Sequence, residues 1–251
     1  MTGSDSGGQR LRGIHPVLEA LRAGRRALYQ VRVREGARAR PIAELVELAG
    51  TLGVPVEEVE AGKWQEEPPG QIELLAGALP EVSLEDLAVA GEAPRTLVAL
   101  DGVEDPQNLG AIARVAEAAG ASGLLLTHRR SAPLSASVSR ASAGAIEWLP
   151  AARVPNLVRA LNQLKSMGFW VFGTTPEGGD DLFTLPDRIV RGDRIVVLGG
   201  EGPGLRRSTL RAVDHRVAIP MGGRVASLNV ATAAAVTLFE LARRGRMASS
   251  P

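Results

Sequence analysis

Residues 194–204 read RIVVLGGEGPG, a short apolar run followed at once by a loop with four glycines. A run of this length is typical of a strand that is buried on both faces. Similar apolar runs at 96–100 and 123–127 also end in loops with polar residues. The pattern therefore predicts a parallel sheet with helices on both sides, because only such a sheet has strands that are apolar throughout.

The same alternation continues across the second half of the chain. Strands are expected at 96–100, 123–127, 169–173, 194–198 and 216–219, and helices at 109–119, 154–167 and 229–243. Glycines follow two of these helices, at Gly120 and Gly168, as helix ends require. We predict one α/β domain over 96–251.

The first half of the chain predicts a smaller α/β domain over 10–79. Helices are expected at 14–21 and 41–52, and strands at 27–33 and 54–59. The acidic stretch 80–95 contains Gly91 and Pro94 and has weak periodicity, which indicates a linker. Residues 1–9 are rich in Gly and Ser and are expected to form a disordered tail.

Composition excludes several classes of protein. The chain has no cysteine, which removes disulfides, thiolate catalysis and Cys-ligated zinc, and no metal is expected. No apolar run reaches the roughly 20 residues needed to cross a bilayer, so no membrane partner is expected. The N-terminus lacks the apolar core of a secretion signal. A cytoplasmic location is compatible with these features.

The formal net charge of +1 hides an uneven distribution. Residues 1–40 carry nine arginines against three acids, whereas 41–100 are strongly acidic. A basic edge is typical of a nucleic-acid binder, although a solvated surface explains it equally well. The preference for arginine over lysine also fits a GC-rich genome.

Three loops at the ends of predicted strands can carry chemistry, because ligands of open α/β sheets bind at the carboxyl ends of the strands. The first, 101–110, reads DGVEDPQNLG; Asn108 can cap the next helix, and Arg114 on that helix is by itself an ordinary surface cation. The second, 199–204, places Glu201 among glycines, where it can bind a ligand or cap a helix. The third, 219–230, reads IPMGGRVASLNV, and Ser227 or Asn229 can cap the last helix.

Two nucleotide motifs are absent from these loops. The glycines at 199, 202 and 204 do not form G-x-G-x-x-G, and no G-x-x-x-x-G-K-[ST] occurs, which argues against a dinucleotide-dependent enzyme and a P-loop enzyme.

Taken together and in order, the three loops resemble the three motifs of the SpoU (TrmH) family of RNA 2′-O-ribose methyltransferases. The matching residues are DPxNxG at 105–110 with Arg114, LGxEGxG at 198–204, and IPM with SLNV at 219–230. The stretch 13–21, GIHPVLEAL, is similar to the start of the family's ribosomal-protein-like RNA-binding domain. The chain most resembles the branch that methylates 23S rRNA guanosine, although it has PGQI at 69–72 where that branch often has His-Gln-Gly.

The resemblance implies a knotted α/β fold whose C-terminal part threads a trefoil, a homodimer with the active site near the subunit interface, and S-adenosylmethionine as methyl donor. It implies that the catalytic residues are Arg114, Asn108, Glu201, Ser227 and Asn229, and that the cofactor lies against Leu198, Gly199, Gly200, Gly202, Ile219, Met221 and Leu228. Arginine side chains are not normally deprotonated in proteins. We therefore expect Arg114 to bind the adjacent RNA phosphate and to stabilise the developing alkoxide, rather than to act as a base.

Other functions stay open at this point. Transfer RNA is an alternative substrate within the same family. A non-catalytic RNA-binding protein could keep the fold, although the intact set of motif residues argues against loss of activity. Antibiotic-resistance methyltransferases share the same fold.

Overall fold

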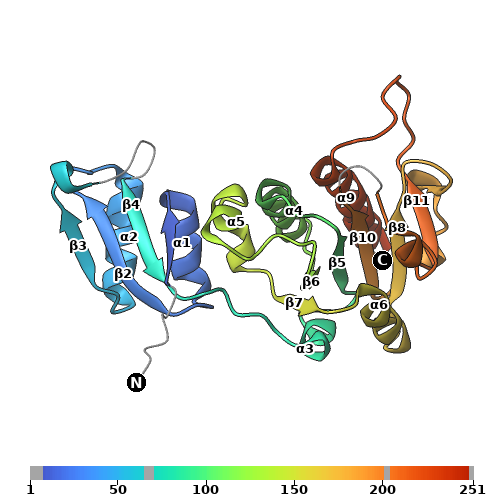
Figure 1. Ribbon diagram of the computed structural model, residues 1–251, viewed down its shortest axis with the longest axis horizontal. Coiled ribbons are helices and arrows are strands. Elements are labelled where there is room, and N and C mark those ends of the chain that lie inside the picture. The colour runs from blue at the N-terminus through green and yellow to red at the C-terminus, as the bar shows by residue number, and fades with distance from the viewer. Residues whose placement is uncertain (1–7, 65–70, 201–203, 249–251) are drawn as a thin grey trace. The chain divides into compact units, whose positions relative to one another are not determined.

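The computed structural model describes residues 8–64, 71–200 and 204–248 (Figure 1). The chain divides into two compact units. Unit 1 comprises the residues up to Pro80 together with Pro133–Trp148, and unit 2 comprises Glu81–Ala132 together with the residues from Leu149 onward.

Unit 2 is built on a parallel sheet with the strand order β7-β6-β5-β10-β8-β11-β9. The strands are β5 (Thr96–Asp101), β6 (Gly123–Thr127), β7 (Ala151–Val154), β8 (Trp170–Thr174), β9 (Asp180–Asp181), β10 (Arg194–Gly199) and β11 (His215–Ala218). Each neighbouring pair of these strands is parallel. Every residue of β5 and β6 is buried, as the apolar runs predicted.

Helices cover both faces of this sheet (Figure 1). They are α3 (Leu84–Val89), α4 (Pro106–Ala118), α6 (Leu157–Ser166), α7 (Asp187–Val190), α8 (Arg207–Leu210) and α9 (Val230–Ala248), with a 3₁₀ turn η3 at Leu182–Thr184. One core joins α3 and α6 to alternate strand residues such as Leu97 and Ile195. Helices α4 and α9 pack against each other on the opposite side. No helix in the described part of the chain is long and apolar enough to cross a membrane.

The predicted strands and helices of the large domain are confirmed, with differences at their ends, whereas β7, β9, α7 and α8 were not predicted. Residue 154 belongs to the unpredicted strand β7, and α6 begins at Leu157 because the Asn156 side chain accepts a hydrogen bond from the Arg159 N–H (3.0 Å). Helix α4 begins at Pro106 and is capped by Asp105, whose carboxylate accepts from the Gln107 N–H (2.9 Å). Asn108, expected as a cap, therefore lies inside the helix.

Unit 1 contains a four-stranded sheet of order β1-β4-β2-β3. Its elements are β1 (Gln9–Arg12), α1 (Ile14–Ala23), β2 (Leu28–Arg34), α2 (Arg40–Thr51), β3 (Val56–Val59), η1 (Ala61–Lys63), β4 (Ile72–Ala76), α5 (Ala136–Ala141) and η2 (Ala145–Glu147). Strand β4 pairs antiparallel with both β1 and β2, and β2 pairs parallel with β3. One face of the sheet, with Leu11, Val31 and Leu74, forms a core with α1 and α2.

The predicted elements of the small domain are present, but β1 and β4 were not predicted. Gln9, assigned to a disordered tail, is the first residue of β1 and pairs with Ala76. Residues 1–7 of that tail lie outside the described residues.

The predicted linker 80–95 is wrong, because it contains a packed helix. The Ser83 hydroxyl caps α3 by accepting from the Asp86 N–H (3.0 Å). Leu84, Leu87 and Ala88 then enter the core of unit 2. The acidic residues Glu85 and Asp86 occupy the first turn, where a helix stabilises negative charge. Acidity here reflects a helix start rather than an open linker.

The segment Pro133–Trp148 also differs from the predicted domains, because it packs within unit 1. Its Glu147 carboxylate forms a buried ion pair with Arg26, with both Arg26 Nε and Nη2 at 2.8 Å. The Ser139 hydroxyl donates to the same carboxylate (2.8 Å). Partners separated by more than 100 residues leave no local signal in the sequence.

Candidate ligand pocket at the carboxyl ends of β8, β10 and β11

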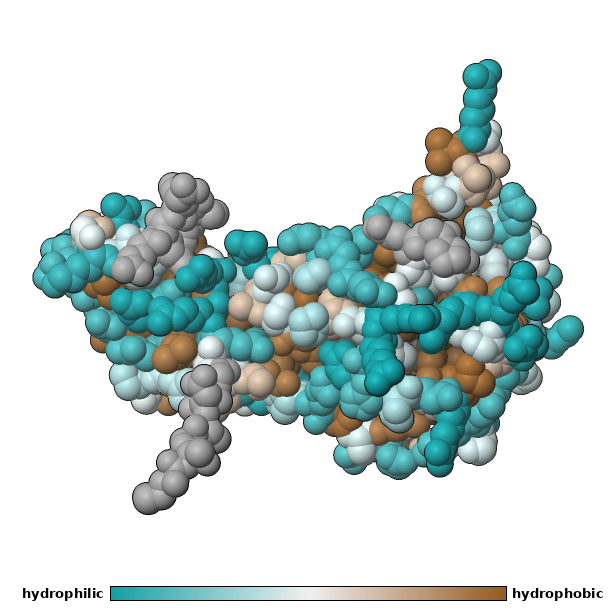
Figure 2. Space-filling model, in the orientation of Figure 1, coloured by the Kyte–Doolittle hydropathy of each residue, from teal (hydrophilic) through white to brown (hydrophobic). Residues whose placement is uncertain are grey.

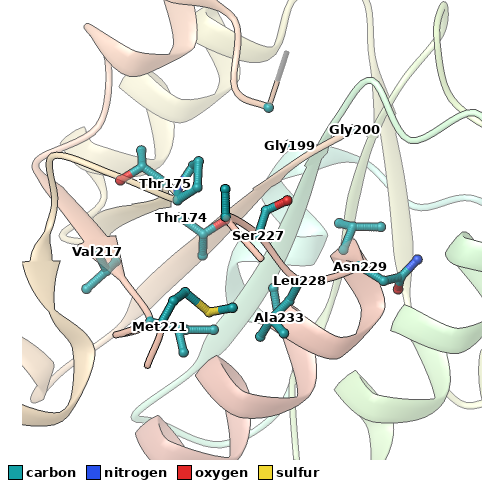
Figure 3. A pocket seen from close by; sticks show the side chains of 15 residues that line it. Thr174, Thr175, Gly199, Gly200, Val217, Met221, Ser227, Leu228, Asn229 and Ala233 are labelled. Carbon is teal, nitrogen blue, oxygen red and sulfur yellow. The ribbon is translucent and has the colours of Figure 1, made fainter. Parts of the chain in front are cut away.

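Unit 2 contains a pocket of about 410 Å³ where three neighbouring strands end (Figure 3). Its walls come from the end of β8, the glycine loop after β10, the end of β11 with the loop that follows it, and the first turn of α9. The lining residues are Thr174, Thr175, Pro176, Gly199, Gly200, Gly204, Val217, Ile219, Met221, Ala226, Ser227, Leu228, Asn229, Val230 and Ala233. The volume is within the range of about 300–1,000 Å³ that small-ligand sites occupy.

The glycine loop after β10 admits no side chain at two positions. A Cβ at Gly200 would collide with the carbonyl group of Gly102, and one at Gly199 would collide with the backbone of Gly204. Gly204 itself has a φ of +66°, which favours glycine. Backbone groups therefore form this wall of the pocket, and the crowding explains why glycines occur here.

Asp101, the last residue of β5, fixes the glycine loop at both ends. Its carbonyl oxygen accepts from the Gly200 N–H (2.9 Å). Its buried carboxylate accepts from the Arg206 N–H (2.9 Å) and forms an ion pair with Arg206 Nε. Asp101 thus binds both Gly200 and Arg206, the residues that flank the loop.

Asn229 connects the pocket to helix α4. Its Oδ1 caps α9 by accepting from the Ala231 N–H (2.8 Å), and its Nδ2 donates to Oδ1 of Asn108 (3.1 Å). Asn229 therefore both caps helix α9 and lines the pocket. Asn108 is buried and lies behind it.

The structure brings together seven of the twelve residues that the resemblance implied. Those that line the pocket are Gly199, Gly200, Ile219, Met221, Ser227, Leu228 and Asn229. Leu198 does not line it, because its side chain is fully buried inside the sheet. Arg114 also does not line it, and its side chain is exposed on α4. Glu201 and Gly202 lie outside the described residues.

Eight lining residues were not among those implied. Four lie in or beside the second and third motifs, namely Gly204, Ala226, Val230 and Ala233. The other four come from β8 and β11: Thr174 ends β8, Thr175 and Pro176 follow it, and Val217 is on β11. The signal was present in part, since a threonine pair and a proline directly follow a predicted strand. The sequence does not connect these residues to the motifs, because β8 is distant from them along the chain and only the strand order places β8 beside β10.

Fold and pocket together place the chain among parallel-sheet α/β proteins that bind a small ligand at the carboxyl ends of their strands. The glycine loop lies after an internal strand late in the chain, unlike the first loop of a dinucleotide-binding fold. A family model described as the SpoU rRNA Methylase family matches residues 95–239, and one described as RNA 2′-O ribose methyltransferase substrate binding matches residues 11–63. The chain belongs to the SpoU rRNA methylase family.

Individual relatives are similar over nearly the whole chain. The 23S rRNA (guanosine-2′-O-)-methyltransferase RlmB of Pseudomonas aeruginosa is 36% identical, over 94% of this chain and 96% of its own. An AdoMet-bound rRNA methyltransferase from Sinorhizobium meliloti has a TM-score of 0.76 at 27% identity, covering 94% of this chain and 87% of its own. The SpoU methyltransferase AviRb from Streptomyces viridochromogenes, in complex with AdoMet, has a TM-score of 0.81 at 24% identity, covering 97% and 92%; it supports the fold alone.

Proposed function

We propose that this protein transfers a methyl group from S-adenosylmethionine to a ribose 2′-hydroxyl in 23S ribosomal RNA. The observation that carries the proposal is the pocket where β8, β10 and β11 end, because two of the three family motifs meet there and Asn229 connects them to the third. The 23S relatives, which match nearly end to end, favour this RNA. Because the proposed substrate is ribosomal RNA, we also propose that the protein acts in the cytoplasm.

The pocket fits the proposed cofactor. Gly199 and Gly200 form one wall with their backbone, where there is no room for a side chain. Ile219, Met221 and Leu228 add apolar surface. Such a wall suits a ligand with both a flat base and polar groups. When bound, S-adenosylmethionine supplies a methyl group on a positively charged sulfur, which is a good leaving group.

The remaining task of the chain is to orient the ribose hydroxyl and help it to lose a proton, which passes to the adjacent RNA phosphate or to water. Ser227 and Asn229 line the pocket and offer a hydroxyl and an amide to the substrate. Asn108 fixes Asn229 through their 3.1 Å hydrogen bond. We assign Glu201 to orienting the substrate on the basis of its motif alone, and Gly202 to close approach of the cofactor.

We assign to Arg114 the role of binding the phosphate next to the reacting ribose. Its side chain is exposed on α4, so it is accessible to RNA. A guanidinium can bind two phosphate oxygens at once and stabilise a developing alkoxide without giving up a proton. We therefore expect Arg114→Lys, which keeps the charge but loses the fork, to lower kcat by about 10- to 100-fold.

The activity test is tritium transfer from labelled S-adenosylmethionine to unmodified RNA, with ribosomal and transfer fractions separated. Label at a ribose 2′-oxygen of 23S rRNA is expected, and its loss in Arg114→Ala ties it to the site. Near-full activity of Arg114→Lys would contradict the proposal that the planar guanidinium of Arg114 binds two phosphate oxygens. Label only in the transfer fraction would select the tRNA alternative, and no label with intact cofactor binding would favour a non-catalytic RNA-binding protein.

We also propose a homodimer and a knotted C-terminal part, as the family resemblance implies. Exposed apolar side chains of unit 2, Val225 and Phe239, support a contact surface there. Light scattering on the purified chain measures the mass directly, and a monomer at micromolar concentration would contradict the dimer.

A further inference from the structure

The sheet of unit 1 has an outer face that carries ordered arginines. Residues Leu11, Val31 and Leu74 point toward α1 and α2, so their neighbours along each strand point the other way. Strand pairing aligns Arg12 of β1 with Glu73 of β4, and Glu73 with Arg32 of β2. These three side chains therefore form one row across the sheet.

Glu73 holds three guanidinium groups with a single carboxylate. Its Oε1 lies 2.9 Å from Arg10 Nη1 and 2.6 Å from Arg32 Nη1, and its Oε2 lies 3.6 Å from Arg12 Nε. The Glu73 side chain is only 4% exposed, whereas those of Arg10 and Arg12 are 55% and 47% exposed. The Glu73 carboxylate is thus covered by the arginines, and two of the three guanidinium groups that it holds are about half exposed to solvent.

The basic face extends beyond the contacts of Glu73. Arg32 has a second acidic partner in Glu57 (3.0 Å), and its hydrogen bonds to Glu73 and to Glu57 hold the pKa of Arg32 above its usual value. Arg34 continues the same face two residues beyond Arg32. Each guanidinium has five N–H donors, more than the shared carboxylates can use.

This arrangement exceeds what stability requires. One cation is enough to pair a buried carboxylate, and exposed ion pairs contribute only about 0–1 kcal/mol each. What it does achieve is order, since a shared carboxylate restricts long side chains that would otherwise be mobile. Ordered guanidiniums lose less entropy when they bind phosphate oxygens.

We propose that this basic array, formed by Arg10, Arg12 and Arg32 around Glu73, binds the phosphate backbone of the substrate RNA. Adjacent strands lie about 4.8 Å apart and alternate residues about 6.8 Å, so the array spans roughly 10 Å across the strands and about 7 Å along them, and it can contact more than one phosphate. In Figure 1, β2 and β4 pass in front of α2, and Figure 2 shows a largely hydrophilic surface there. The inference rests on the proposed function, because it takes the methylated RNA as the ligand.

The test compares two double variants that lose the same charge from unit 1. Arg12→Gln/Arg32→Gln removes two members of the array. Arg22→Gln/Arg40→Gln removes two exposed helix arginines that are likewise paired with glutamates, Glu19 and Glu44. Binding of in vitro transcribed 23S rRNA is measured by filter retention across a series of KCl concentrations, and unfolding is monitored in parallel.

We expect the array variant to bind roughly 10- to 100-fold more weakly at 0.1 M salt, with the slope of log K against log salt reduced by about 1.4–1.8, while the control keeps nearly the wild-type slope. KM for RNA rises in the array variant, and kcat at saturating RNA is unchanged. If that variant folds poorly, we use Arg10→Gln/Arg34→Gln, which keeps Arg12 and Arg32 beside Glu73. It is also expected to bind RNA more weakly and with a reduced salt slope.

Equal losses in both double variants would overturn the proposal in favour of diffuse attraction. Wild-type RNA binding in the array variants would also overturn it, and would leave the face to an acidic protein partner. If the protein binds RNA through the array but transfers no methyl group, the proposed activity is contradicted and the proposed RNA-binding surface is not. The two failures are therefore distinguishable.

Discussion

At the scale of the residue, close packing of the backbone explains why glycines form the wall of the pocket. Gly199 and Gly200 are required because the backbone of Gly204 and of Gly102 occupies the space of their missing side chains. The same two residues shape the pocket wall, and the Gly200 N–H donates to the Asp101 carbonyl oxygen. A glycine motif here reflects close backbone approach, as it does in unrelated ligand sites.

Gly200→Ala tests this directly. The added methyl would meet the Gly102 carbonyl group, so either residue 200 or the segment that follows β5 must shift. We expect a loss of about 1–3 kcal/mol in the free energy of unfolding and at least tenfold weaker S-adenosylmethionine binding. Calorimetric titration and urea unfolding measure the two effects. Gly222→Ala is the matched control, because a Cβ there meets nothing within 4 Å and its φ is not positive; similar behaviour of the two variants would refute the crowding argument.

At the scale of the element, helix starts decide what a polar residue does. Asp105 caps α4, so Asn108 lies inside the helix and reaches Asn229 rather than the helix end. Ser83 caps α3, so an acidic stretch becomes a packed helix rather than a linker. In both cases the residue that caps the helix sets where the helix begins, and this decides what the residues after it contact.

Leu87→Ala measures how firmly α3 belongs to unit 2. Leu87 is fully buried in the core of that unit, whereas Val89 on the same helix is 63% exposed. We expect Leu87→Ala to lower the free energy of unfolding by about 2–5 kcal/mol and Val89→Ala to change it by less than about 0.5 kcal/mol. Urea denaturation followed by circular dichroism makes the comparison. A small effect at Leu87 would restore the interpretation of this stretch as a linker.

At the scale of the whole molecule, the chain builds unit 1 from two separate pieces. Pro133–Trp148 lies between β6 and β7 in sequence, yet it packs within unit 1. The buried pair Arg26–Glu147 joins the two pieces, with both side chains 1% exposed. Gln9 and Gly77 accept further hydrogen bonds from Arg26 (each 3.1 Å), so the guanidinium is well satisfied.

Removal of one partner leaves the other charge buried without compensation. Glu147→Ala is therefore expected to cost about 3–5 kcal/mol in the stability of unit 1. Glu44→Ala, which breaks an exposed pair with Arg40 in the same unit, is expected to cost less than about 1 kcal/mol. Hydrogen exchange of the unit 1 amides resolves the effect to this unit. Equal exchange in both variants would show that the pair does not hold the segment.

The sequence alone determined the repeating pattern of strands and helices, the order of the motifs and hence the family, because apolar period and loop composition are local properties. Only the tertiary structure decided which strand ends meet. Strand order brings Thr174 beside Gly199, and Asn108 meets Asn229 across 121 residues. It also assigned 80–95 to the core of unit 2, gave 133–148 to unit 1 and aligned three arginines on one carboxylate. The physical reason is that these contacts arise from packing and strand register between distant segments, which leave no periodic trace in the chain.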